Sequence, residues 1–282
     1  MPDQATELRK LVLRATRDQG RDTGPAPRNV VVTGGKGGLG VTTLAVNLAV
    51  ALAGQGARVV LVDADLHRAD VAMLCGVTER GDVADVLSQR RDIHEVLVLG
   101  PAGIQLVPGL WAPGARETYS ARQHDRLLRQ FHSLGRHADL VLVDVGSGTH
   151  ESVRKFWEHA HRIVMVTTPD AYAVMDTYAT IKSLADTQRP LPISLLVNQA
   201  EDGNLAADVH RRIDQSSRRF LGRPVDWLGH VPLDPAIPEA ARQSVPFVLR
   251  GDRKPARLAV EQLAMRLIGE IQGAAARENQ AA

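Results

Sequence analysis

A glycine-rich run, GGKGGLGVTT at residues 34–43, constrains this chain more than any other feature of its sequence. Four of the seven residues at 35–41 are glycine, and the run joins an apolar segment at 29–33 to another at 41–54. Glycines let the backbone curl so that successive N–H groups face one anion, and the N-terminus of a following helix adds its dipole. The run therefore predicts a loop between a strand and a helix that holds the phosphates of a nucleotide.

Two phosphate-binding motifs fit this loop. Gly35, Gly37 and Gly40 satisfy G-x-G-x-x-G, and Asp63 follows about 20 residues later, at the end of the next apolar segment, as in dinucleotide-binding folds. The P-loop motif G-x-x-x-x-G-K-[ST] starts at the same glycine and fits except that Val41 occupies the position of the lysine. The loop alone leaves both motifs open.

Hydroxyl and carboxylate side chains favour a nucleoside triphosphate with Mg²⁺. Thr42 and Thr43 offer one hydroxyl to a metal ion and one to a phosphate, which a dinucleotide fold does not need. The segment ADLVLVDVGSG resembles a Walker B strand that ends at Asp144, and the run DAD adds Asp63 and Asp65 at the end of another strand. Three acids beside one phosphate loop predict a metal site, although an aspartate in this place can also simply cap the loop that follows its strand.

The rest of the chain alternates apolar strands with amphipathic helices. Most strand segments are continuous apolar runs, which are typical of parallel strands buried on both faces. This alternation predicts an α/β fold, a doubly wound and mostly parallel sheet with helices on both faces and ligands at the carboxyl ends of the strands. The expected strands are residues 29–33, 57–63, 103–108, 138–144, 161–167, 192–198 and 225–232, and the expected helices are residues 41–54, 121–136, 149–159, 171–186, 204–219, 234–243 and 256–272.

Both ends of the chain are expected to lie outside this domain. Leu8, Leu11, Val12 and Ala15 form a narrow apolar stripe at helical spacing, and the glycines and prolines that follow break regular structure. The expected organisation is an N-terminal partner-activating helix at 1–19, a flexible linker at 20–28, a nucleotide-binding domain at 29–272 and a disordered tail at 273–282.

Composition points to the cytoplasm. The single cysteine, Cys75, cannot form an internal disulfide, and no apolar run approaches the ~20 residues of a membrane span. The net charge of +2 is close to neutral, and no specific nucleic-acid partner is expected.

The sequence resembles the MinD/ParA class of deviant P-loop ATPases over residues 28–272. The signature lysine of that class, early in the loop, matches Lys36. Within the class, the run DVGSGTHESVRKFWEHAHRIVMVTTPDAYAVMDTYATIKSL at 144–184 is most similar to FlhG, the regulator of flagellar number. The run DQATELR at 3–9 resembles the DQAxxLR element with which that family engages and stimulates the GTPase FlhF. The residues that match this partner-binding element are Asp3, Gln4, Ala5, Leu8 and Arg9.

This resemblance implies a role for each matching residue. Lys36 would reach the phosphates of the nucleotide in the partner subunit of an ATP-bound homodimer, and Asp65 would orient the attacking water. Mg²⁺ would be held by Thr42, Asp63 and Asp144. ATP would be bound by Gly35, Lys36, Gly37, Gly38, Leu39, Gly40, Val41, Thr42 and Thr43, and its base by Asn198, Pro232 and Asp234.

Val41 departs from the family pattern. A lysine at this position makes a charge-assisted contact to the phosphates worth about 1.5–3 kcal/mol, so its loss weakens ATP binding about tenfold to a hundredfold and slows hydrolysis. Two functions are therefore weighed: an FlhG-like switch that acts on FlhF and on flagellar basal-body components, and a polar-localisation scaffold similar to CpaE that does not hydrolyse ATP. A dinucleotide-dependent oxidoreductase is the third and weakest.

The C-terminal segment is a second departure. MinD and FlhG end in an amphipathic membrane-targeting helix, but the periodic segment at 257–271 lacks aromatic residues and a strongly basic face. We expect it to pack on the domain. Peripheral attachment to the inner membrane or the cell pole is the less supported alternative to a purely cytoplasmic location.

Overall fold

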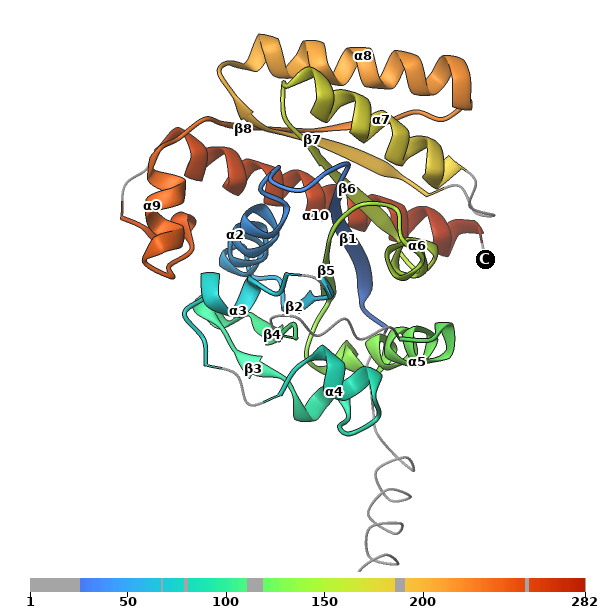
Figure 1. Ribbon diagram of the computed structural model, residues 1–282, viewed down its shortest axis with the longest axis vertical. Coiled ribbons are helices and arrows are strands. Elements are labelled where there is room, and N and C mark those ends of the chain that lie inside the picture. Colours follow the sequence, from blue (N-terminus) through green and yellow to red (C-terminus); the bar gives the residue numbers. More distant parts are fainter. Residues whose placement is uncertain are drawn as a thin grey trace, which may run out of the picture.

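The computed structural model describes residues 26–66, 68–78, 81–110, 119–185, 191–251 and 254–281, with side chains up to residue 274 in the last range. One sheet runs through the middle of the molecule, and helices cover both of its faces (Figure 1). The helix predicted at 1–19, and with it the residues matching the FlhF-binding element, lies outside the described residues.

The sheet of the described residues has eight strands in the order β3-β4-β2-β5-β1-β6-β7-β8. Only the pair of β3 and β4 is antiparallel, and β1 lies at the centre between β5 and β6. The strands are β1 (Arg28–Gly34), β2 (Val59–Asp63), β3 (Val98–Leu99), β4 (Gln105–Val107), β5 (Leu140–Ser147), β6 (Arg162–Thr167), β7 (Ile193–Ala200) and β8 (Asp226–Pro232).

The helices divide into two layers because each strand presents alternate residues to opposite faces. In β1, Val30 and Val32 join one buried cluster and Val31 the other. The first cluster lies under α2 (Val41–Gly54), α3 (Val71–Leu74), α9 (Ala236–Arg242) and α10 (Pro255–Ala281). The second lies under α4 (Val83–Leu87), α5 (Ala121–His132), α6 (Glu151–Glu158), α7 (Ala171–Ala185) and α8 (Gly203–Leu221). Short 3-10 turns, η1 (Ile93–Glu95), η2 (Pro101–Gly103), η3 (Ser133–Arg136) and η4 (Phe247–Leu249), connect these elements.

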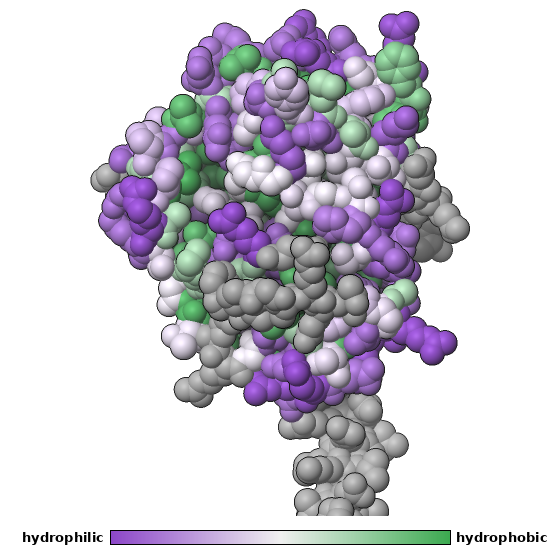
Figure 2. Space-filling view, in the orientation of Figure 1, coloured by the Kyte–Doolittle hydropathy of each residue, from purple (hydrophilic) through white to green (hydrophobic). Residues whose placement is uncertain are grey.

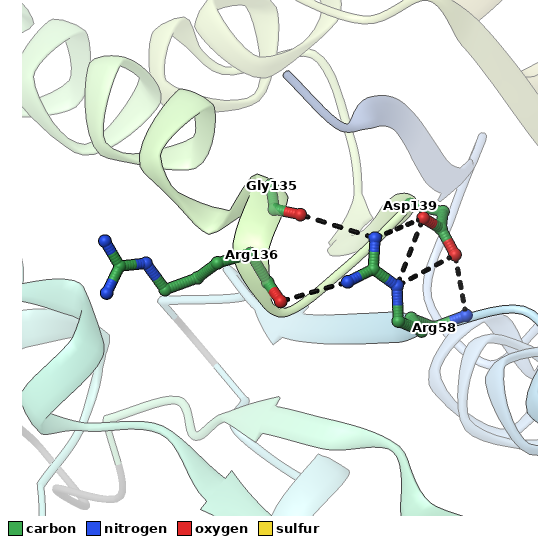
Figure 3. Close-up of polar contacts among 4 residues, drawn as sticks. All are labelled: Arg58, Gly135, Arg136 and Asp139. Atoms are coloured by element: carbon green, nitrogen blue, oxygen red, sulfur yellow. Dashed lines mark hydrogen bonds and ion pairs between the residues drawn. The ribbon is translucent and has the colours of Figure 1, made fainter. Parts of the chain in front are cut away.

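An arginine and an aspartate link the amino-terminal ends of two neighbouring strands, at the opposite ends of the strands from the glycine-rich loop. Arg58, just before β2, binds Asp139, just before β5, with its Nη2 2.5 Å from Asp139 Oδ1 (Figure 3). The same guanidinium donates to the carbonyls of Gly135 and Arg136 at the end of η3, and it holds the pKa of Asp139 below its ordinary value. This register carries Asp63 and Asp144, each five residues further along, to neighbouring positions.

The α/β fold and the seven expected strands are confirmed, with bounds shifted by one to three residues. The two-residue strand β3 and the short helices α3 and α4 were not expected. The last helix differs most. It begins at Pro255 and runs to Ala281, through residues expected to form a disordered tail.

Helix α10 packs on the domain, as its sequence indicates. Leu263 and Leu267 are buried, and the helix contacts α2 and β8. In the part of the chain that the structure describes, no helix combines the length and the apolar character that a membrane span requires.

Candidate functional site

The glycine-rich loop follows β1 at the centre of the carboxyl edge of the sheet, where the fold places ligands. Two of its glycines are required by close packing. A Cβ on Gly35 would lie 2.5 Å from backbone atoms of Asp176 and Thr177 in α7. Gly40 has a φ of +83°, and a Cβ there would lie 2.6 Å from the side-chain nitrogen of Asn198. The loop is therefore wedged between α7 and β7.

The apolar residues of the loop point into the core. Leu39 and Val41 are only 2% and 7% exposed and join the cluster under α2. A Cβ on Gly34 would lie 2.9 Å from a methyl group of Val41. Val41 thus packs the start of α2 against the end of β1. The groups of the loop that can bind phosphates are its backbone N–H groups, the two threonine hydroxyls and Lys36, the one cationic residue of the loop.

Lys36 forms an ion pair with a residue of its own chain. Its Nζ lies 3.0 Å from Oδ1 of Asp170, the residue before α7, and the pair is partly exposed. The same oxygen accepts a 2.9 Å hydrogen bond from the backbone N–H of Ala173. This backbone bond, followed by Lys36, lowers the pKa of Asp170. Asp170 is a site residue that sequence reasoning missed.

Two buried aspartates lie side by side, Asp63 as the last residue of β2 and Asp144 within β5. Asp63 and Asp144 are fully buried neighbours in register. Asp63 accepts hydrogen bonds from the backbone N–H groups of Val71 at 3.1 Å and Asp65 at 3.3 Å. Burial raises the pKa of Asp144 to about 6. Burial, together with the Asp144 charge, raises the pKa of Asp63 well above its ordinary value.

These residues fit a magnesium ion. Asp144 accepts a hydrogen bond from the N–H of Gly146, and the nearby Thr42 hydroxyl also acts to lower its pKa. Its Oδ2 is buried with no partner among the described residues. Two adjacent carboxylates resist joint ionisation unless a cation balances them. The described residues contain no cluster of three or more His, Cys, Asp or Glu side chains placed for a metal. A site with so few protein ligands suits Mg²⁺, since this ion keeps several waters and takes further oxygen ligands from phosphates.

Asp65 lies beside the turn that follows β5. Gly146 has a φ of +65°, and a Cβ on it would collide with the Asp65 carboxylate. The Thr33 hydroxyl donates to the Gly146 carbonyl at 3.1 Å, and the Gly148 N–H donates to the Gly34 carbonyl at 3.3 Å. The ends of β1 and β5 are therefore tied together, with Asp65 at their junction.

The residues expected to bind the base lie on the other side of the loop. Asn198 is 5% exposed, and its Nδ2 donates to the Leu39 carbonyl at 2.8 Å. Its Oδ1 is buried without a partner among the described residues, which leaves an acceptor for the amino group of a base. Pro232 lies on neighbouring β8, opposite Ala200. Asp234 follows, and its carboxylate accepts from the Ala236 N–H at 2.8 Å.

Asn47 is a second residue that sequence reasoning missed. It is 3% exposed within α2, and its Nδ2 donates to the Thr43 carbonyl at 2.7 Å. Its Oδ1 accepts the backbone N–H of Val248 in η4 at 3.1 Å. In the sequence, the sign that could have revealed it is an asparagine among the apolar residues of this helix.

Comparison with known proteins identifies this arrangement. The ParA family model, described as NUBPL iron-transfer P-loop NTPase, matches residues 26–268. The chain belongs to the ParA/MinD family of P-loop NTPases. This membership also removes the dinucleotide-binding interpretation of the loop.

Its relatives include flagellar and cell-division proteins. The antiactivator FleN of Pseudomonas aeruginosa is 32% identical over 238 residues, which cover 84% of this chain and 85% of FleN. The flagellum site-determining protein YlxH of Helicobacter pylori is 26% identical, covering 82% of this chain and 78% of YlxH.

Solved structures agree with the fold. MinD in the MinC:MinD complex of Aquifex aeolicus superposes with a TM-score of 0.71 and 25% identity, covering 86% of this chain and 96% of that one. MinD of Pyrococcus horikoshii, solved with Mg-ADP, gives a TM-score of 0.72 at 23% identity with the same coverage.

Proposed function

We propose that this protein is a MinD-like, ATP-dependent switch that regulates the number or placement of flagella. The observation that carries the proposal is the joint presence, around one phosphate loop, of Lys36, the Thr42 hydroxyl and the buried acid pair Asp63 and Asp144. The similarity to FleN and YlxH supports the flagellar assignment.

Each site residue takes a defined part in this switch. The loop N–H groups hold the phosphates of ATP, and Mg²⁺ binds near Thr42, Asp63 and Asp144. Asp65 orients the attacking water, while Asn198, Pro232 and Asp234 surround the base. These assignments are supported by the acid pair, by the buried Asn198 Oδ1, which has no partner in the described part of the chain, and by the family pattern.

Lys36 makes dimerisation depend on the nucleotide. In the isolated chain it pairs with Asp170 across a partly exposed contact, which is weak enough to exchange for another anion. The phosphates of ATP in a partner subunit carry more negative charge than one carboxylate. ATP in both subunits therefore favours the homodimer, and its loss returns Lys36 to Asp170.

Val41 favours slow hydrolysis. Its side chain is buried and neutral, so each site lacks the cation that usually compensates the charge of the transferring phosphate. This feature supports the second candidate, a nucleotide-binding polar-localisation scaffold similar to CpaE.

The oligomeric state of the full chain separates the two candidates. With MgATP, we expect light scattering to show a shift from monomer to dimer that Lys36→Ala abolishes. Lys182→Ala, which removes an exposed lysine from α7, serves as the matched control and should still dimerise. Nucleotide binding with an unchanged oligomeric state in the wild-type chain would contradict the switch and leave the scaffold.

The N-terminal element extends this proposal to partners. Its match to DQAxxLR supports an FlhF-type GTPase as one partner and flagellar basal-body components as others. The full chain is expected to stimulate GTP turnover by an FlhF-type GTPase. Gln4→Ala combined with Arg9→Ala should abolish the stimulation while leaving ATP-dependent dimerisation intact.

A further inference from the structure

A cavity of about 410 Å³ lies between α9, η4 and the start of α10, and no residue of the phosphate loop lines it. Its volume lies in the range of small-molecule sites. Its walls combine four cationic and two acidic side chains with an apolar surface. The lining residues include Asp234, Ile237, Glu239, Arg242, Phe247, Arg250, Lys254 and Arg257. Hydrophilic side chains gather over α9 at the left of the molecule (Figure 2).

The cationic side chains around this cavity differ in their ion-pair and hydrogen-bond partners. Arg242 is paired with Glu239. Arg257 binds Glu261 with 2.8 Å between Nε and Oε1, and its Nη1 donates to the Arg250 carbonyl at 2.9 Å. Arg250 is the exception, because its Nη1 is buried without a hydrogen-bond partner among the described residues.

A buried guanidinium N–H that lacks an acceptor is costly, and an anion is the group that satisfies it best. Lys254, exposed at the rim before α10, adds a second positive charge on the same side. Phe247 and Ile237 supply an apolar wall. Guanidinium groups match the tetrahedral oxygens of phosphate particularly well.

We infer that this cavity binds a small phosphorylated metabolite, with its phosphate on Arg250 and Lys254 and its apolar part against Phe247. The concave shape selects a free small molecule over an extended polymer. The cavity has no lining residue in the phosphate loop, and it shares Asp234 with the residues proposed to surround the base.

The experiment uses inorganic pyrophosphate as the probe and the full chain saturated with MgADP. Calorimetric titration is expected to show one pyrophosphate bound per chain. Arg250→Met and Lys254→Met should each weaken it about tenfold or more, because each removes a charge-assisted contact. Arg129→Met, at an exposed arginine on α5, is the charge-matched control and should leave the affinity unchanged. Lys254 is exposed, so its variant remains informative even if Arg250→Met does not fold.

Three results would overturn the proposal. The first is absence of pyrophosphate binding in the wild-type chain. The second is binding that neither variant weakens, which would place the anion at the phosphate loop. The third is sedimentation with phosphatidylglycerol vesicles, lost in Arg250→Met, without binding of free pyrophosphate, which would assign the anion to a lipid headgroup.

Discussion

Gly35 and Gly37 belong to the same loop but have different surroundings. A Cβ on Gly35 would lie 2.5 Å from the backbone of α7, whereas the nearest atom to a Cβ on Gly37 is the Ser147 hydroxyl oxygen at 4.0 Å. Gly35→Ala must push the loop away from α7, and we expect it to cost about 1–3 kcal/mol of unfolding free energy. Gly37→Ala should change it by less than about 0.5 kcal/mol. Urea unfolding of the nucleotide-free protein measures both, and equal losses would contradict the packing argument.

Val41 provides a second test at the level of single residues. Val41→Lys restores a cation at the phosphates, so ATP affinity should rise about tenfold to a hundredfold despite the lost packing of a buried valine. Val41→Met disturbs the packing without adding charge and should not raise the affinity. Calorimetry with MgATP measures the difference. If the methionine variant gains as much as the lysine variant, charge is not what the native loop lacks.

The candidate site was predictable where its residues follow one another in the sequence. The loop glycines, Asp63 and Asp144 each follow an apolar run of sequence, and parallel strands bring such positions together at their carboxyl ends. Asp170 was not predictable as the partner of Lys36, because the contact joins positions 134 residues apart. The Asn47 bridge to η4 spans 201 residues and equally depends on how the layers pack.

At the scale of elements, the long buried strands and helices were predictable because their apolar periodicity is strong. The β3 strand was missed because it has two residues and Leu99 is 74% exposed, so no buried pattern marks it. The short helices α3 and α4 have four and five residues, too few for a helical period to emerge. The extension of α10 beyond residue 272 follows no apolar repeat.

A buried arginine fastens α10 to the sheet. Arg162 in β6 is 7% exposed and contacts Ser194 at 2.6 Å, Glu270 at 3.1 Å and Asp226 at 3.2 Å. Arg162→Met leaves the Glu270 carboxylate half-buried without its cation, so we expect a loss of roughly 3 kcal/mol, the lower end of the range for a broken buried pair.

Glu270→Gln is the matched control for this variant. Burial raises the pKa of Glu270 despite the nearby Arg162, so the folded protein favours the ionised carboxylate less than the unfolded chain does. Glutamine keeps an acceptor for the Ser194 hydroxyl, and the change in unfolding free energy should stay within about 1 kcal/mol. Urea unfolding compares the two variants, and a larger loss for Glu270→Gln would contradict this account.

For the whole molecule, the two edge strands of the sheet differ in how well other elements cover them. At one edge α10 packs against β8, and Arg162 links α10 to the interior. At the other edge β3 is a two-residue antiparallel strand with an exposed leucine. The phosphate loop and the acid pair lie between these edges, on β1, β2 and β5. The candidate nucleotide site is thus built on buried strands in the interior of the sheet.

This asymmetry predicts a gradient of amide hydrogen exchange. Amides of β1 and β5 should exchange only through global unfolding, whereas those of Val98 and Leu99 should exchange through local opening and be the fastest of the strands. Mass spectrometry of the wild type and of Arg162→Met tests this. The variant should accelerate β1 and β5 by the factor that its loss of stability sets, about a hundredfold for roughly 3 kcal/mol, and leave β3 unchanged. Equal acceleration of β3 would mean that this edge opens only with the whole sheet.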